Sequence, residues 1–173
     1  FANTQITIKI DGKEITSDVA PQLIQNRTMV PIRVITESMG ADVNWLQESS
    51  TVEIISPYGR FMKSYSEKGM FIKQAEEILP LFREDKFVIL DVRSAQLRGV
   101  SYIKDSIFIP LPKLMDSLDL LPNDKPIAVY CAKNINASYA VTILNMLGYD
   151  AYLLENGMDA WKTAGGDITI CNT

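Results

Sequence analysis

The second half of the chain alternates short apolar runs with amphipathic stretches, and this alternation restricts its fold more than any other feature. Four apolar runs have the length of buried strands: residues 87–90, 107–109, 127–130 and 151–154. Helical length and spacing are found between them at residues 73–82, 114–121, 137–147 and from 157 onward. This order predicts a parallel sheet covered by helices on both faces, in which ligands bind beyond the carboxyl ends of the strands.

Cys131 lies at one of these strand ends. It directly follows the apolar run 127–130, and the helical stretch 137–147 starts six residues later. A thiol in this position faces unpaired backbone N–H groups and the positive end of a helix dipole, and Lys133 adds a positive charge. These groups favour the thiolate, which is the reactive form, and predict a nucleophile with an anion-binding loop. The alternative is a packing role, because free cysteine is among the most buried residue types.

Composition removes several classes of chemistry. The chain contains no histidine, so a Cys–His pair and histidine metal ligands are excluded. Cys131 and Cys171 lie far apart without metal-ligand spacing, although a disulfide between them stays an alternative. The net charge of −4 argues against nucleic acid as a partner, and no apolar run reaches the length of a membrane span. We therefore expect no metal, no cofactor, no nucleic-acid partner and no membrane span.

The first half is rich in short strands. Alternating residues and turn signals predict hairpins at 5–16, 21–30 and 42–55, with a helix from Pro31 to Gly40. This pattern indicates a small α+β domain. We expect residues 60–65 to add a strand and the domains to cover 1–65 and 66–173. Pro80 is expected to break the helical stretch 73–82.

Residues 5–55 resemble the copper amine oxidase N-terminal-like domain. The match lies in four motifs in the family's order, at residues 11–15, 26–33, 37–41 and 43–45. Despite the name, the domain is not a copper site. Such modules resemble stalk or adhesion units of secreted and cell-surface proteins in Gram-positive bacteria. The resemblance therefore implies an extracytoplasmic location in the cell envelope and a cell-wall or protein partner for this domain.

Residues 70–165 resemble a rhodanese domain. The matching motifs lie at residues 88–94, 103–111, 121–127, 129–131, 147–149 and 152–161. The resemblance implies a rhodanese-like α/β fold and sulfur transfer, in which a small sulfur-containing anion such as thiosulfate donates sulfane sulfur and a thiol or cyanide accepts it. It assigns Cys131 as the nucleophile and the substrate-binding loop to five residues: Ala132, Lys133, Asn134, Ile135 and Asn136.

The same resemblance makes Asp91 and Arg93 supports of the site. Their alternative role is a structural ion pair at the end of the sheet.

The loop departs from the family pattern Cys-x-x-Gly-x-Arg-Ser. The Gly position is Asn134, which can adopt a left-handed conformation, and the Arg position is Asn136, which removes a bidentate anion contact. The alternative to sulfur transfer is therefore a weak or inactive binding or scaffold module. A redox sensor is a third possibility. Phosphatase chemistry is excluded because Ala137 stands where the required arginine would be.

Overall fold

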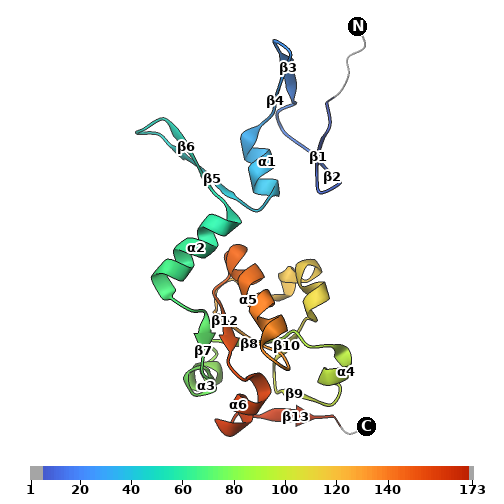
Figure 1. Ribbon diagram of the computed structural model, residues 1–173, viewed down its shortest axis with the longest axis vertical. Coiled ribbons are helices and arrows are strands. Elements are labelled where there is room, and N and C mark those ends of the chain that lie inside the picture. Colours follow the sequence, from blue (N-terminus) through green and yellow to red (C-terminus); the bar gives the residue numbers. More distant parts are fainter. Residues whose placement is uncertain (1–5, 172–173) are drawn as a thin grey trace. The chain divides into compact units, whose positions relative to one another are not determined.

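The computed structural model describes residues 6–171. The chain divides into two compact units, Phe1–Arg60 and Phe61–Thr173 (Figure 1). Helix α2 (Pro57–Lys68) contains the boundary between them.

The N-terminal unit consists of three antiparallel hairpins and one helix, as the sequence predicts. The hairpins are β1–β2 (Ile8–Ile10, Lys13–Ile15), β3–β4 (Gln22–Ile24, Arg27–Met29) and β5–β6 (Asp42–Leu46, Thr51–Ile55). Helix α1 (Ile32–Ser38) follows β4. Asp11 and Gly12 both have positive φ, which is the conformation that a tight two-residue hairpin turn requires.

The second unit is built on a five-stranded parallel sheet in the order β10-β8-β11-β12-β7. The predicted fold class, a rhodanese-like parallel sheet flanked by helices, is therefore confirmed. The strands are Ile107–Phe108, Val88–Asp91, Ile127–Tyr130, Ala151–Leu154 and Ile72–Lys73. A separate antiparallel pair joins β9 (Ser101–Ile103) to β13 (Ile168–Ile170). Strands β7, β9 and β13, which are only two or three residues long, were not predicted from the sequence.

Helices cover both faces of this sheet, and the residues of each strand alternate between two cores (Figure 1). Leu90, Val129 and Cys131 face the core on the side of α5 (Ile135–Met146) and the 3₁₀ helix η1 (Leu111–Asp116). Ile89, Ala128 and Tyr130 face the opposite core, which contains residues of α3 (Ala75–Arg83) and α6 (Gly157–Thr163). The remaining elements are α4 (Ala95–Arg98) and the 3₁₀ helix η2 (Leu118–Leu120). Cys131 and Tyr130 thus point to opposite faces.

Three expectations about secondary structure are wrong. Residues 60–65 belong to helix α2 and not to a strand. Ser56 Oγ accepts the N–H of Gly59, Pro57 occupies the first helical position, and the rings of Phe61 and Tyr65 stack one turn apart. These local signals favour a helix over the expected strand.

Pro80 does not break α3, which runs to Arg83. Burial of Ala75, Ile78 and Leu79 on one face offsets the backbone hydrogen bond that the proline cannot donate. The expected helix at 114–121 is instead two short 3₁₀ segments, η1 and η2.

Candidate active site

The thiol of Cys131 lies between the end of β11 and the first turn of α5. The backbone N–H of Ala137 donates to Sγ over 3.3 Å. Only 7% of the residue is exposed, and it belongs to the core on the α5 side of the sheet. One helix N–H group therefore points directly at the sulfur, as the interpretation of Cys131 as a nucleophile requires.

The loop after Cys131 is shorter than the sequence suggests. Asn134 has φ 63°. Its carbonyl oxygen accepts two hydrogen bonds from Ser138, one from the backbone N–H at 2.8 Å and one from the side-chain hydroxyl at 2.9 Å. These bonds start α5 at Ile135, so Ile135 and Asn136 lie in the first helical turn and not in the loop. Asn134 does adopt the left-handed conformation that the sequence allows at the family's glycine position. The true loop is Ala132 to Asn134.

The surface of this segment is mostly uncharged. Ala132 and Lys133 are exposed, as are Ile135 and Asn136 in the helical turn that follows. Lys133 is the one cation between Cys131 and Ser138. An anion bound here would meet backbone N–H groups and a single flexible ammonium, without the forked contact that arginine provides.

Gly157, at the start of α6, allows the backbone of Cys131 to approach closely, a role not anticipated from the sequence. It has φ +49°, and a Cβ at this position would lie 2.8 Å from the carbonyl oxygen of Cys131. A side chain here would displace the backbone that carries the thiol. The Gly-Met pair at the start of the last helix was the available sequence signal.

Asp91 and Arg93 form a buried pair at the end of β8. Arg93 Nε donates to Asp91 Oδ1 at 2.9 Å and Nη2 donates to Oδ2 at 2.7 Å, so the contact is bidentate. Tyr130 donates its hydroxyl to Asp91 Oδ2 at 2.8 Å, and Arg98 donates to the same oxygen at 3.2 Å. The carboxylate is therefore saturated with hydrogen bonds inside the protein.

This network has consequences for protonation. Burial opposes ionisation of Asp91, but the hydrogen bonds from Arg93 and Tyr130 outweigh it, and the pKa of Asp91 lies below its usual value. Burial, followed by the charge of Asp91, raises the pKa of Tyr130 to about 12. Asp91 is thus a permanent anion and Tyr130 a permanent donor near neutral pH.

The Asp91 network lies on the face of the sheet opposite to Cys131. Tyr130 and Asp91 are direct partners across β11 and β8, and Tyr130 belongs to the core on the α6 side. Arg93 also donates to the carbonyl of Ser101, and the Tyr130 hydroxyl accepts the N–H of Ile103, so the network joins the sheet to β9. Within residues 6–171, no hydrogen bond links Asp91 or Arg93 to the thiol. This arrangement supports the structural alternative for both residues. The roles of Tyr130 and Arg98 could not be predicted from the sequence, because only the fold brings them to Asp91.

Cys131 and Cys171 are both free thiols, so the alternative of a disulfide between them is wrong. Residues 6–171 contain no group of three or more His, Cys, Asp or Glu side chains suited to a metal ion. No helix described in this range is long and apolar enough to cross a membrane.

Two family models match the chain. Residues 74–164 match the rhodanese-like domain, and residues 3–59 match the copper amine oxidase N-terminal domain. The chain belongs to the rhodanese-like family and carries the second domain in front of it. Both resemblances seen in the sequence are confirmed.

Two curated relatives are named as sulfurtransferases. The thiosulfate sulfurtransferase GlpE of Pseudomonas savastanoi is 29% identical over 89 residues, covering 51% of this chain and 84% of that protein. A tRNA sulfurtransferase of Desulfurococcus amylolyticus is 23% identical over 151 residues, covering 84% of this chain and 30% of that protein. The chain thus spans less than a third of the length of the second relative.

Solved structures show the same fold. A rhodanese-related protein from Thermoplasma volcanium superposes with a TM-score of 0.52 and 28% identity, covering 57% of this chain and 96% of that one. A rhodanese-like domain protein from Staphylococcus aureus gives a TM-score of 0.50 and 28% identity, covering 53% of this chain and 91% of that one.

Proposed function

We propose that the protein is a sulfurtransferase or persulfide carrier in which Cys131 accepts sulfane sulfur. The observation that carries the proposal is the position of Cys131 Sγ, at the end of a parallel strand with the N–H of Ala137 donating to it at 3.3 Å. Membership of the rhodanese-like family and similarity to proteins named as sulfurtransferases support it.

The chemistry needs only the thiolate and a donor. Cys131 Sγ attacks the outer sulfur of thiosulfate or of a persulfide, forming a new S–S bond. The donor's own S–S bond breaks, and its electron pair leaves with sulfite or with the donor's thiolate. A thiol acceptor then attacks the terminal sulfur of the Cys131 persulfide, which restores the Cys131 thiolate. Cyanide as acceptor gives thiocyanate by the same displacement. No external oxidant or reductant is required.

The chain's own groups stabilise the anions of this cycle. The N–H of Ala137 in the first turn of α5 donates to the sulfur, and Lys133 adds a positive charge in the loop before the helix. Asn136 supplies no forked cation, which favours singly charged persulfide donors over the thiosulfate dianion. Replacing Asn136 with arginine is expected to raise thiosulfate turnover about tenfold or more, since charge-assisted hydrogen bonds contribute roughly 1.5–3 kcal/mol each.

Mass spectrometry after incubation with polysulfide tests the proposal. We expect the wild type and a Cys171→Ser control to gain sulfur on Cys131 and to release it to a thiol. Cys131→Ser should gain none at residue 131 and should transfer sulfur at the uncatalysed rate. Absence of any sulfur adduct on Cys131 in the folded wild type would overturn the proposal.

A catalytically inactive binding or scaffold role is the second candidate. It is favoured by the burial of the Cys131 thiol and by the loss of the family's glycine and arginine at Asn134 and Asn136. Sulfur turnover that disappears in Cys131→Ser would eliminate this candidate.

We also propose an extracytoplasmic location for the protein, in the envelope of a Gram-positive bacterium. The match of residues 3–59 to the copper amine oxidase N-terminal domain supports this location. Fractionation of the host cells with detection by antibody tests it, and recovery only with the cytoplasmic markers would contradict it.

A further inference from the structure

Two exposed apolar side chains lie at the end of α5 that meets the Cys131 thiol. Ile135 is the first residue of the helix, and Tyr139 follows one turn later on the same side. Each is 60% exposed, and neither belongs to a hydrophobic core of the described residues. Ile135 comes two residues before Ala137, whose N–H donates to Cys131 Sγ at 3.3 Å. The exposed pair therefore starts close to the reactive sulfur.

Helix geometry directs this pair toward the loop. The Cα–Cβ bonds of a helix tilt toward its N-terminus, so Ile135 is directed to the loop end of α5 and Tyr139 toward Ile135. Isoleucine gives the helix itself no advantage, because β-branched residues are weaker helix formers than unbranched ones. With no role in the core and none in starting the helix, the side chain of Ile135 is free to contact a ligand of the loop.

The burial of Cys131 limits how a sulfur donor can reach it. Only 7% of the residue is exposed, so a donor can insert its sulfur atoms while its organic group stays outside. The exposed residues next to the thiol in the chain are Ala132, Lys133, Ile135 and Asn136. The organic group of a donor therefore lies over these residues, among which Ile135 offers the largest apolar surface.

The charge of this segment suits a donor with no more than one negative charge. Lys133 is the only charged residue between Cys131 and Tyr149 in the sequence. The first turn of α5 contains no acidic residue, which leaves the positive end of the helix dipole uncompensated. One ammonium beside apolar surface complements a persulfide with an uncharged organic group better than it complements a polyanion.

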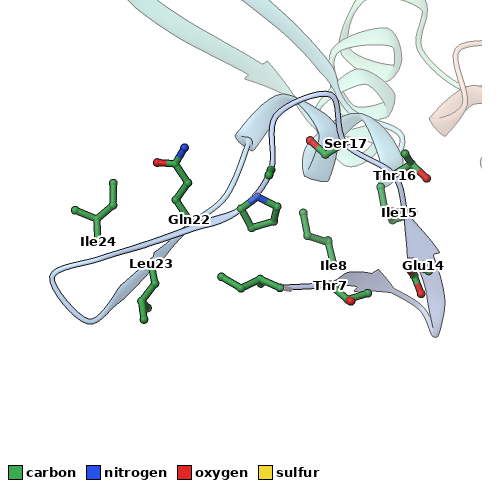
Figure 2. Close-up of a pocket in the computed structure, with 12 residues that line it drawn as sticks. Thr7, Ile8, Glu14, Ile15, Thr16, Ser17, Gln22, Leu23 and Ile24 are labelled. Atoms are coloured by element: carbon green, nitrogen blue, oxygen red, sulfur yellow. The ribbon is translucent and has the colours of Figure 1, made fainter. Parts of the chain in front are cut away.

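A cavity of about 940 Å³ in the N-terminal unit supplies no alternative site for such a donor. It is lined by residues within the segment 6–24, with Thr7, Glu14 and Gln22 among the polar ones (Figure 2). The residues that line it include neither a cysteine nor a cation, and Glu14 would repel an anion. The donor must therefore bind beside Cys131.

We propose that the sulfur donor of this site is a persulfide with an uncharged, apolar organic group, and that Ile135 and Tyr139 bind that group. The inference rests on the proposed sulfur transfer by Cys131 and names its donor class. The Cys131 thiolate attacks the terminal sulfur of R–S–SH, and a new S–S bond forms. The bond between the two donor sulfurs breaks, and R–S⁻ leaves with the electron pair, while the proton stays on the transferred sulfur.

Methanethiosulfonate reagents test the apolar contact without any sulfur transfer. Each reagent passes its R–S group to the Cys131 thiolate and releases methanesulfinate. In the Cys171→Ser protein, and relative to free N-acetylcysteine, the benzyl reagent should modify Cys131 about tenfold faster than the hydroxyethyl reagent, because its ring is removed from water. Equal relative rates, or no modification of Cys131 by the benzyl reagent, would overturn the proposal.

A pair of matched variants assigns the preference to Ile135. Ile135→Thr should reduce the ratio of benzyl to hydroxyethyl rates about threefold, because it removes apolar surface at the contact. Ile170→Thr is the control, since Ile170 is 67% exposed on β13, and it should leave the ratio unchanged. An equal fall of the ratio in both variants would contradict the assignment.

Two persulfides separate the donor class from sulfur transfer itself. Benzyl persulfide should load sulfur onto Cys131 faster than hydroxyethyl persulfide, as measured by mass spectrometry of the Cys171→Ser protein. Equal loading from both would overturn the proposed donor class and leave sulfur transfer by Cys131 in place. Loading from neither would overturn both proposals.

Discussion

The two faces at the carboxyl edge of the sheet hold very different groups. On one face, Asp91 accepts hydrogen bonds from Arg93, Arg98 and Tyr130, and is fully buried. On the other, the Cys131 thiol receives a single backbone hydrogen bond from Ala137. A saturated charge is fixed in one state, whereas a sulfur with one weak contact keeps its capacity to react. The conspicuous charged residues therefore stabilise the edge, and the inconspicuous thiol is the candidate for chemistry.

The largest expected effect is on stability, from the charged face. Asp91→Asn leaves Arg93 buried without its anion and should cost about 3–5 kcal/mol of unfolding free energy. Cys131→Ala is the matched change on the other face and should cost far less, while abolishing sulfur transfer. Denaturant unfolding followed by the fluorescence of Trp161, which is buried in the second unit, measures both. If the two variants lose equal stability, the contrast between the faces is wrong.

The same face should give the protein its response to pH. The pKa of Asp91 is lowered in the folded state, so its contribution is full above the unfolded pKa of about 3.9 and is lost as pH falls through the folded value. The pKa of Tyr130 is raised to about 12, so its contribution is full below about 10 and is lost as pH rises toward 12. The free energy of unfolding should therefore decrease at both acidic and strongly alkaline pH.

Variants separate the two contributions. Asp91→Asn should flatten the acid limb, and Tyr130→Phe should reduce the alkaline one. Tyr152 also has a pKa raised to about 12, by burial and by Asp150, so part of the alkaline loss should persist in Tyr130→Phe. If Asp91→Asn lost as much unfolding free energy at low pH as the wild type, the hydrogen bonds to Asp91 would not control the acid response.

Gly157→Ala tests how tightly the reactive face is positioned. Its Cβ would lie 2.8 Å from the Cys131 carbonyl oxygen, so we expect a loss of about 1–3 kcal/mol together with slower sulfur transfer. Gly165→Ala is the control, because Gly165 also has positive φ but would meet no atom within 4 Å. It should cost about 1–2 kcal/mol from backbone strain alone and leave transfer unchanged. Equal transfer rates in the two variants would mean that the Gly157 contact does not position the thiol.

The smallest change in the free energy of unfolding is expected for substitutions of Asn134. Its side chain makes no capping hydrogen bond and its φ is 63°. Asn134→Gly should therefore be close to neutral, whereas Asn134→Ala should cost about 1 kcal/mol because alanine pays more for the left-handed conformation. Thermal unfolding of the two variants measures the difference. If Asn134→Ala unfolded at the same temperature as Asn134→Gly, the left-handed conformation at residue 134 would not depend on the residue type.

Features set by neighbouring residues could be predicted from the sequence. The hairpin turn at Asp11 and Gly12 and the strand that ends at Tyr130 follow from local preferences. For Asn134 the sequence only allows the left-handed conformation that the structure shows. Helix α2 was not predicted, although its signals are local: Ser56 and Pro57 lie at its start and Phe61 and Tyr65 are spaced one helical turn apart. Strands β7, β9 and β13 carry too few residues to show a period, and their pairing alone defines them.

The sequence by itself determined the fold class, the two-domain order and the strand end that carries Cys131, because periodicity and turn chemistry are properties of short segments. The tertiary structure decided which face each group occupies. Strand pairing set Asp91 against Tyr130 and away from the thiol, and the packing of α6 brought Gly157 against Cys131. These contacts join residues 26 or more positions apart, counted from 131 to 157 and from 91 to 130, so no local pattern encodes them.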